Sequence, residues 1–145
     1  MKHPRSYNTD AATRKRMSNV HLKYGKDENL LALSLWHDGI RYRRNYKKLP
    51  GSPDIAITKY KIAVFVDGEF WHGYDWEYKK KRLKRNRNYW VQKIEENIRR
   101  DKRNDILLRK KGWQPIHFWA KTVLKNTDYC VAKIEYFIRS KEEND

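Results

Sequence analysis

Residues 61–72 read KIAVFVDGEFWH, and the first seven of them, Lys61 to Asp67, predict a β-strand. The run contains few polar residues, which is typical of a strand in the middle of a sheet. A second run with β-branched residues, Asp54 to Thr58, comes just before it, and only Lys59 and Tyr60 separate the two. Such a short connection predicts an antiparallel hairpin.

Patterns on either side of the hairpin predict further elements and a loop over 68–87. They are a helix from Asp27 to Gly39, a strand from Ile40 to Tyr46, a turn at 49–53, a helix from Asn88 to Lys111, a strand from Gln114 to Trp119 and a helix from Asp128 to Arg139. The order α-β-β-β-α-β-α implies an α/β fold, with a mixed β-sheet flanked by helices.

The chain is strongly basic, with 34 Lys and Arg against 18 Asp and Glu and a net charge of +16 over 145 residues. This length suits one domain with a real core. We expect a basic N-terminal arm over residues 1–20 and a single domain over residues 21–145. The charge favours a polyanionic partner, with nucleic acid ahead of an anionic membrane surface. Composition leaves RNA open beside DNA.

Cysteine usage and hydropathy narrow the class of protein. The single cysteine, Cys130, rules out an intramolecular disulfide and a zinc site made of several cysteines. No apolar run approaches the roughly 20 residues that a membrane helix requires, and residues 1–16 lack the apolar segment of a signal peptide. We therefore expect a cytoplasmic protein without a membrane segment.

Three acidic residues lie close to the ends of predicted helices and strands. Glu28 lies in the first helix, Asp54 begins a strand, and Asp67 ends the next one. A hairpin brings Asp54 and Asp67 to the same end of the sheet, where two carboxylates can bind a hard cation such as Mg²⁺. The alternative is structural, with Asp54 as a turn residue and Asp67 as the cap of a strand.

The segment after Asp67 carries a histidine and two large aromatics. Near a metal and a phosphate, His72 can take a proton from water, since its usual pKa is about 6.5. On its own, such a histidine is more often a surface residue or a hydrogen-bonded loop residue. Phe70 and Trp71 stand beside a basic run, as stacking or wedging between bases requires. Their alternative role is simple burial in the core.

The basic run from Lys79 to Arg87 suits contacts with phosphates, which position a protein on nucleic acid without reading its sequence. It contains seven cationic residues, Lys79, Lys80, Lys81, Arg82, Lys84, Arg85 and Arg87. On the long helix, Asn97, Asp101 and Asp105 continue the apolar face of Ile94 at spacings of three or four. They either reach the edge of the sheet or form an ordinary solvated helix surface.

Several strings of this sequence share the order and spacing of motifs in one known family. They are TR at 13–14, LPGSPD at 49–54, VFVDGEFWH at 64–72, YWVQKI at 89–94, NIRRD at 97–101 and GW at 112–113. With these strings the chain resembles the very short patch repair (Vsr) endonucleases. The resemblance runs from about residue 10 to residue 120, and it implies a restriction-endonuclease-like α/β core.

The resemblance also implies an activity, Mg²⁺-dependent hydrolysis of one DNA strand beside a T:G mismatch left by deamination of 5-methylcytosine. It implies Asp54 as the main metal ligand, with the backbone carbonyl of Val66 beside it, and His72 as the base that activates water. Asp67 falls where the best-known members carry a second histidine, and an acid there can bind metal directly. Glu28 matches an acid that supports the site.

Other matched positions concern DNA and partners. Phe70, Trp71 and Trp90 match aromatics that intercalate beside the mismatch, and Asn97 and Asp101 match polar residues near the active centre. The expected DNA contacts also include Arg14 and the basic run. Members of the family act as monomers helped by mismatch-repair proteins, although nothing in this sequence identifies such a protein.

One feature of the family is missing. The family commonly holds a structural zinc with three cysteines and one histidine, and the matching positions here are Glu69, Tyr74, Trp76 and Lys121. No structural zinc is therefore expected. Packing of Tyr74, Trp76 and Tyr78 is expected to hold the loop over 68–87 instead.

The leading hypothesis is a Mg²⁺-dependent phosphodiesterase whose product has a 5′-phosphate and a 3′-hydroxyl. The runner-up is a sequence-specific restriction or homing-type endonuclease on the same fold. A non-catalytic DNA-binding module is a third hypothesis. It does not explain why Glu28, Asp54 and Asp67 approach a surface that attracts phosphate, where uncompensated acids repel DNA.

Overall fold

The computed structural model describes residues 25–144, so the expected N-terminal arm and Arg14 lie outside the described residues. A helix covers residues 25–37. The other elements are β1 (Arg43–Arg44), β2 (Ile55–Ile57), β3 (Ile62–Asp67), α2 (Trp76–Lys80), α3 (Arg87–Lys110), β4 (Gln114–Trp119), α4 (Ala120–Lys125) and α5 (Thr127–Asn144). Among the described residues, no helix is both long and apolar enough to cross a membrane.

The four strands form one mixed sheet in the order β1-β2-β3-β4. The β2–β3 pair is an antiparallel hairpin with Ile55 opposite Val64. The β3–β4 pair is parallel, and its register runs from Ile62 opposite Gln114 to Asp67 opposite Trp119. The hairpin, the central position of β3 and the α/β class predicted from the sequence are therefore confirmed.

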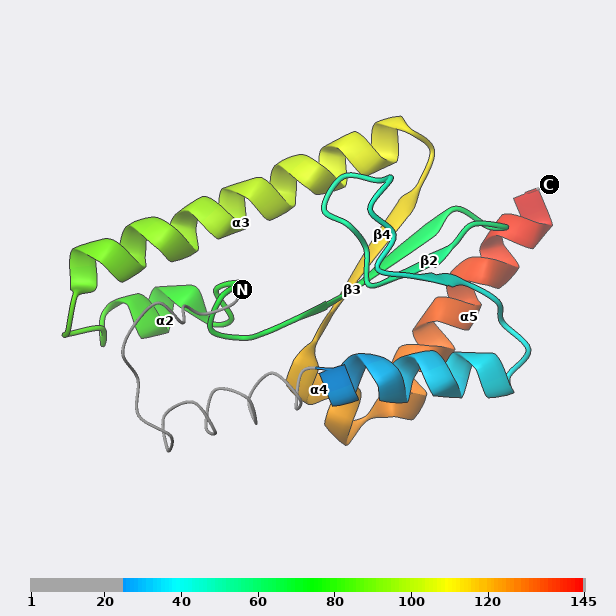
Figure 1. Cartoon of the computed structure of the whole chain (residues 1–145), viewed down its shortest axis with the longest axis horizontal. Coiled ribbons are helices and arrows are strands. Elements are labelled where there is room, and N and C mark those ends of the chain that lie inside the picture. Colours follow the sequence, from blue (N-terminus) through cyan, green and yellow to red (C-terminus); the bar gives the residue numbers. More distant parts are fainter. Residues whose placement is uncertain (1–24, 145) are drawn as a thin grey trace.

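Alternate residues of the strands belong to two different apolar clusters. The larger one joins Ile55, Ile57, Ile62 and Val64 to the helix over residues 25–37 and to α5. The smaller one joins Ala63, Phe65 and Leu108 of α3. Successive strand residues point to opposite faces, so the helices cover both faces of the sheet. Figure 1 shows α3 and the helix over residues 25–37 on opposite sides of the strands.

Four details differ from the sequence prediction. The strand expected over 40–46 shrinks to the two residues of β1, and Asn45, with a φ of 47°, ends its extended backbone. The loop expected over 68–87 contains α2. A five-residue helix has little stability of its own, and α2 depends on contacts with α3. Burial of Ala120 and Val123 adds α4, and α5 is longer than expected.

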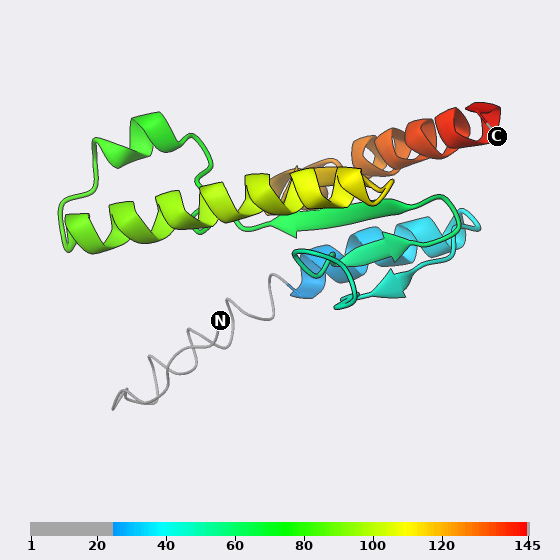
Figure 2. The same ribbon diagram turned by 90° about the horizontal axis from the view of Figure 1, so that it is seen from above.

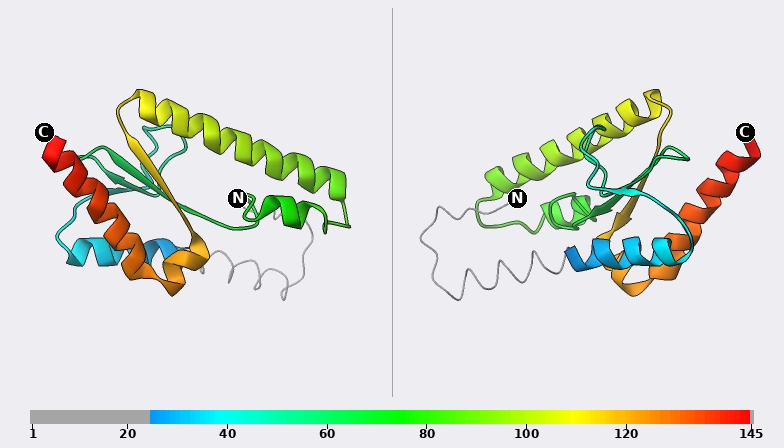
Figure 3. Two further views of the ribbon diagram at one scale, coloured as in Figure 1. Left: turned by 180° about the vertical axis from the view of Figure 1, so that it is seen from behind. Right: turned by 45° about the vertical axis from the view of Figure 1, so that its right-hand side comes forward.

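The first half of α3, together with α2, extends beyond the end of the sheet. Figures 2 and 3 show this arrangement from above and from behind. The loop from β3 to α2 returns along α3, and it packs there without space for a side chain at Gly73. A Cβ atom at Gly73 would lie 2.5 Å from Cδ1 of Ile98. This close approach fixes the loop that follows Asp67.

Candidate active site

The hairpin brings Asp54 and Asp67 together at one end of β3. The Val66 backbone N–H donates to Oδ2 of Asp54 at 2.7 Å, which directs this carboxylate toward the strand end that carries Asp67. Burial raises the pKa of Asp54 to about 6, and the negative charge of Asp67 adds to the shift. The two carboxylates carry like charges and repel each other, and a bound cation relieves that repulsion.

Glu28 joins this group from the helix over residues 25–37. Burial raises the pKa of Glu28 to about 7, and the charge of Asp54 adds to the shift. Arg44 opposes it from β1, with its Nη2 atom 3.8 Å from Oε1 of Glu28. The charge of Asp54 therefore acts on Glu28, and the charge of Asp67 acts on Asp54, at this end of the sheet.

His72 lies between two acids. Its Nδ1 atom is 2.6 Å from Oδ2 of Asp101 and 3.9 Å from Oδ1 of Asp67. Burial opposes the charged form, but the hydrogen bond to Asp101 and the charge of Asp67 prevail and raise the pKa of His72 above its usual value. The ring has a fixed partner at Nδ1, so the other ring nitrogen, Nε2, is the one available for chemistry.

The polar face of α3 points into this site rather than into solvent. Asn97 Nδ2 donates to the Trp71 carbonyl at 3.0 Å and so holds the loop before His72. One turn later Asp101 binds His72, and one turn further Asp105 approaches the sheet. Of the two roles that the sequence left open, contact with the sheet edge is the one observed.

His117 of β4 is a member of the site that the sequence analysis missed. Its Nδ1 atom lies 2.7 Å from Oδ2 of Asp67, and its Nε2 atom lies 2.8 Å from Oδ1 of Asp105. Burial opposes the charged form, yet the hydrogen bonds to both acids raise the pKa of His117 to about 9. No motif marks His117 in the sequence, and only the parallel β3–β4 register places it beside Asp67.

Aromatic side chains form a compact group next to the acids. Phe70, Trp71 and Trp90 contact one another edge to face, with ring centroids 5.2 to 5.5 Å apart. Tyr89 extends this group at 5.0 Å from Trp90 and is exposed. Phe70 is 40% exposed. The group is therefore partly open to solvent, and simple burial in the core does not describe it.

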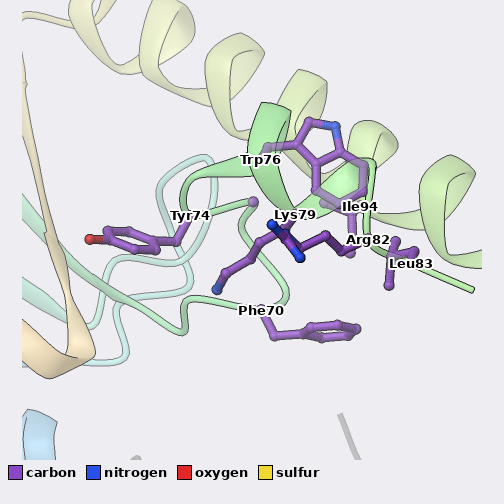
Figure 4. A pocket seen from close by; sticks show the side chains of 8 residues that line it. Phe70, Tyr74, Trp76, Lys79, Arg82, Leu83 and Ile94 are labelled. Atoms are coloured by element: carbon purple, nitrogen blue, oxygen red, sulfur yellow. The ribbon is translucent and has the colours of Figure 1, made fainter.

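A cavity of about 310 Å³ beside this aromatic group is lined mainly by apolar and aromatic residues, and Lys79 and Arg82 are its cationic members. Figure 4 shows the side chains of Lys79 and Arg82 lying between Phe70 and Trp76. Lys80 binds Oε2 of Glu95 at 2.7 Å and is already paired. Arg87 donates to the carbonyls of Lys80 and Leu83. The residues of the basic run that stand exposed are Lys81, Arg82, Lys84, Arg85 and Arg87.

Comparison with known proteins identifies the family. A family model described as DNA mismatch endonuclease Vsr matches residues 7–78. A protein named Type II nicking enzyme V.NmeDIP, from Neisseria meningitidis serogroup C, is 45% identical over 134 residues, which cover 92% of this chain and 90% of the relative. The chain belongs to the Vsr family.

Other relatives support the same family assignment. Type II nicking enzyme V.HpaIIP of Haemophilus parainfluenzae is 48% identical over 76% of this chain and 78% of its own length. The DNA mismatch endonuclease Vsr of Escherichia coli (strain K12) is 32% identical over 76% of this chain and 70% of its own length. The resemblance drawn from the motifs is confirmed, and so are the restriction-endonuclease-like fold and the assignment as a DNA endonuclease.

Nucleases of the Vsr family are generally metal-dependent, and the residues of this site fit a hard cation. Asp54, Asp67 and the Val66 carbonyl supply oxygen, which Mg²⁺ prefers. Within residues 25–144, no three His, Cys, Asp or Glu side chains are gathered so as to hold a metal alone. Mg²⁺ does not require such a cage, because it binds through one or two carboxylates, waters and substrate phosphates.

Direct contacts link the four positions that the resemblance matches to zinc ligands, Glu69, Tyr74, Trp76 and Lys121, to neighbouring elements. Glu69 Oε2 accepts the Lys121 backbone N–H at 2.8 Å, and this bond ties the loop to α4. Trp76 Nε1 donates to Glu95 of α3 at 3.0 Å. Tyr74 packs edge to face on Trp119 with ring centroids 5.1 Å apart. Tyr78, also expected to hold the loop, stacks with Arg82 of the same loop.

Proposed function

We propose that this Vsr-family endonuclease nicks one strand of duplex DNA at a T:G mismatch in a Mg²⁺-dependent reaction. The observation that carries the proposal is the convergence of Glu28, Asp54 and Asp67 with His72 at the end of β3, next to an open aromatic group. The relatives named nicking enzymes support cleavage of one strand. The Escherichia coli relative named DNA mismatch endonuclease, together with the family description, supports the mismatch as target.

In this proposal Asp54, Asp67 and the Val66 carbonyl hold Mg²⁺. The ion, when bound, polarises the scissile phosphate and neutralises charge that develops on it. The hydrogen bond from the Val66 N–H keeps one oxygen of Asp54 occupied and so fixes the direction of the other. Glu28 adds negative charge from the neighbouring helix and increases the attraction of the site for a cation.

His72 serves as the general base in this scheme. Its Nδ1–H donates to Asp101, so the lone pair stands on Nε2, which accepts the proton of the attacking water. The raised pKa of His72 means that activity increases with pH until this ring is neutral. Hydrolysis leaves a 5′-phosphate and a 3′-hydroxyl.

The aromatic group supplies the contact with the mismatch. Phe70, Trp71 and Trp90 present partly exposed rings to a duplex, and a side chain wedged between base steps unstacks them at a cost of a few kcal/mol. A mismatch is unstacked more easily than a paired step, so the wedge favours it. Lys79, Lys81, Arg82 and Arg85 hold the phosphates beside it. Lys80 supports this surface through Glu95.

A nicking assay tests the proposal. Duplexes that differ only by T:G against C:G are compared at one salt concentration, with Mg²⁺ and with a chelator. We expect one nicked strand, faster cleavage of the T:G duplex and no cleavage without the metal. Equal rates on both duplexes would favour the restriction or homing-type alternative. Binding without cleavage under every condition would favour a non-catalytic module.

A further inference from the structure

The imidazole ring of His117 is hydrogen-bonded at both nitrogens and stacked on one face. Its ring stacks on Phe65 with centroids 4.7 Å apart and planes 10° apart. The two residues are direct partners in the parallel β3–β4 pair. Asp67 follows Phe65 by two positions, so it points to the same face of the strand. The register of the sheet therefore places the His117 ring beside the Asp67 carboxylate.

Asp105 completes the arrangement from the other side. Both of its oxygens lie within 2.9 Å of His117 Nε2, while His117 Nδ1 lies 2.7 Å from Oδ2 of Asp67. A ring nitrogen that faces a carboxylate acts as the donor, so His117 donates at both ends. A continuous chain of hydrogen bonds runs from α3 through β4 to the end of β3.

This series of hydrogen bonds restricts the orientation of the Asp67 carboxylate. Because Oδ2 of Asp67 is occupied by His117, the carboxylate cannot rotate freely, and Oδ1 is the oxygen that faces His72 at 3.9 Å. A carboxylate fixed in this way offers one oxygen in one direction. Outer hydrogen bonds of this kind orient the groups that bind metals and substrates.

We propose that His117, held by Asp105, is a positioning residue that orients Asp67 so that its Oδ1 atom faces His72 and is the oxygen that would hold a metal. This inference rests on the proposed function, because it assigns a role within that same site. His117 itself does not touch DNA or the attacking water. It acts through Asp67, and Asp105 acts through His117.

Two conservative variants distinguish the roles of the two ring nitrogens of His117. An asparagine amide reproduces the position of Nδ1, so His117→Asn keeps a donor for Asp67. A glutamine amide reproduces the position of Nε2, so His117→Gln keeps a donor for Asp105 alone. Substitution of the exposed His37 by the same two residues provides a matched control.

Two measurements are made on the full chain, the nicking rate at saturating DNA and the binding of Mn²⁺ followed by electron paramagnetic resonance. We expect His117→Asn to stay within about threefold of the parent in both. We expect His117→Gln to lose about 10- to 100-fold in rate and to bind Mn²⁺ at least tenfold more weakly, as for other outer partners of metal ligands. Thermal unfolding of both variants verifies that they are folded.

Equal Mn²⁺ affinity of the two variants, or no measurable binding of Mn²⁺ to the parent, would overturn the positioning role. Losses that follow the melting temperature in both variants would likewise reduce His117 to a structural residue. If the parent binds Mn²⁺ and His117→Gln weakens this binding while no protein nicks DNA, the positioning role holds and the proposed function fails.

Discussion

The Nδ1 atom of His72 and the Oδ2 atom of Asp101 lie 2.6 Å apart, although 29 positions separate the two residues in the sequence. His72 follows β3 in a loop, whereas Asp101 belongs to the middle of α3. The contact fixes the orientation of the imidazole and determines which of its nitrogens is free. It also joins the loop of the site to the helix that carries Asn97 and Asp105.

Removal of this partner should change both the rate and its pH dependence. Asp101→Ala takes away the acceptor and the negative charge that raise the pKa of His72. A base must be neutral to act, so the acid limb of the nicking rate should shift to lower pH. Loss of orientation should lower the maximal rate by about 10- to 100-fold. A pH–rate profile measures both effects.

Asp128→Ala, an exposed acid on α5, is the matched control and should leave the profile in place. An acid limb at the same pH in Asp101→Ala and in the parent would contradict the assignment of His72 as the titrating base.

Asp54→Asn should stabilise the protein when no divalent metal is present. Burial, helped by Asp67, raises the pKa of Asp54 from 3.8 unfolded to about 6 folded. The ionised form is therefore disfavoured in the folded state. The parent loses stability as pH rises from about 4 to about 6, whereas asparagine, which can still accept the Val66 N–H, does not. The gain should reach about 1–3 kcal/mol above pH 6, and its upper limit corresponds to the full rise in pKa.

Thermal unfolding in chelator checks this prediction across pH. The melting temperature of Asp54→Asn should match that of the parent near pH 4 and exceed it by about 3–6 °C at pH 7. Added Mg²⁺ should raise the melting temperature of the parent more than that of the variant. A variant that melts lower than the parent at pH 7 would show that the folded state does not disfavour the ionised carboxylate of Asp54.

The aromatic group should contribute to DNA binding more than an ordinary exposed ring does. Trp90→Ala removes the ring that contacts both Phe70 and Trp71. A base stacked on an aromatic ring contributes about 1–3 kcal/mol to the free energy of binding. Loss of this contact corresponds to a loss in affinity of roughly 5- to 150-fold. Fluorescence anisotropy with a labelled T:G duplex measures this loss. Tyr136→Ala, whose ring is 60% exposed on α5, should bind as the parent does.

The contact between Glu69 and α4 should stabilise the loop without metal. Glu69→Ala leaves the Lys121 N–H without its acceptor and should cost about 1–3 kcal/mol. Glu69→Gln keeps an acceptor oxygen and should lose less than half as much. Thermal unfolding compares the two. A strong zinc chelator should not change the melting temperature of the parent, and a marked fall would show that a bound metal holds this loop.

Local pattern was sufficient to predict the hairpin, α3 and β4. The β-branched runs and the short turn after Thr58 predict the β2–β3 pair. The spacing of Asn97, Asp101 and Asp105 places them on one face of α3, but the contact of that face with the sheet is known only from the structure. The helix α2 was not predictable, since it depends on contacts such as that of Trp76 with Glu95. His117 was missed for the same reason, because its partners come from two other elements.

The most direct test of the active centre is single-turnover nicking of a T:G duplex by the parent and by Asp54→Asn, at equal occupancy of DNA and in the presence of Mg²⁺. We expect the parent to cut one strand. We expect Asp54→Asn to bind the duplex at least as tightly but to cut it more than about 1,000-fold more slowly, a loss of about 4 kcal/mol or more in stabilisation of the transition state. Cleavage by Asp54→Asn at the rate of the parent would contradict this prediction.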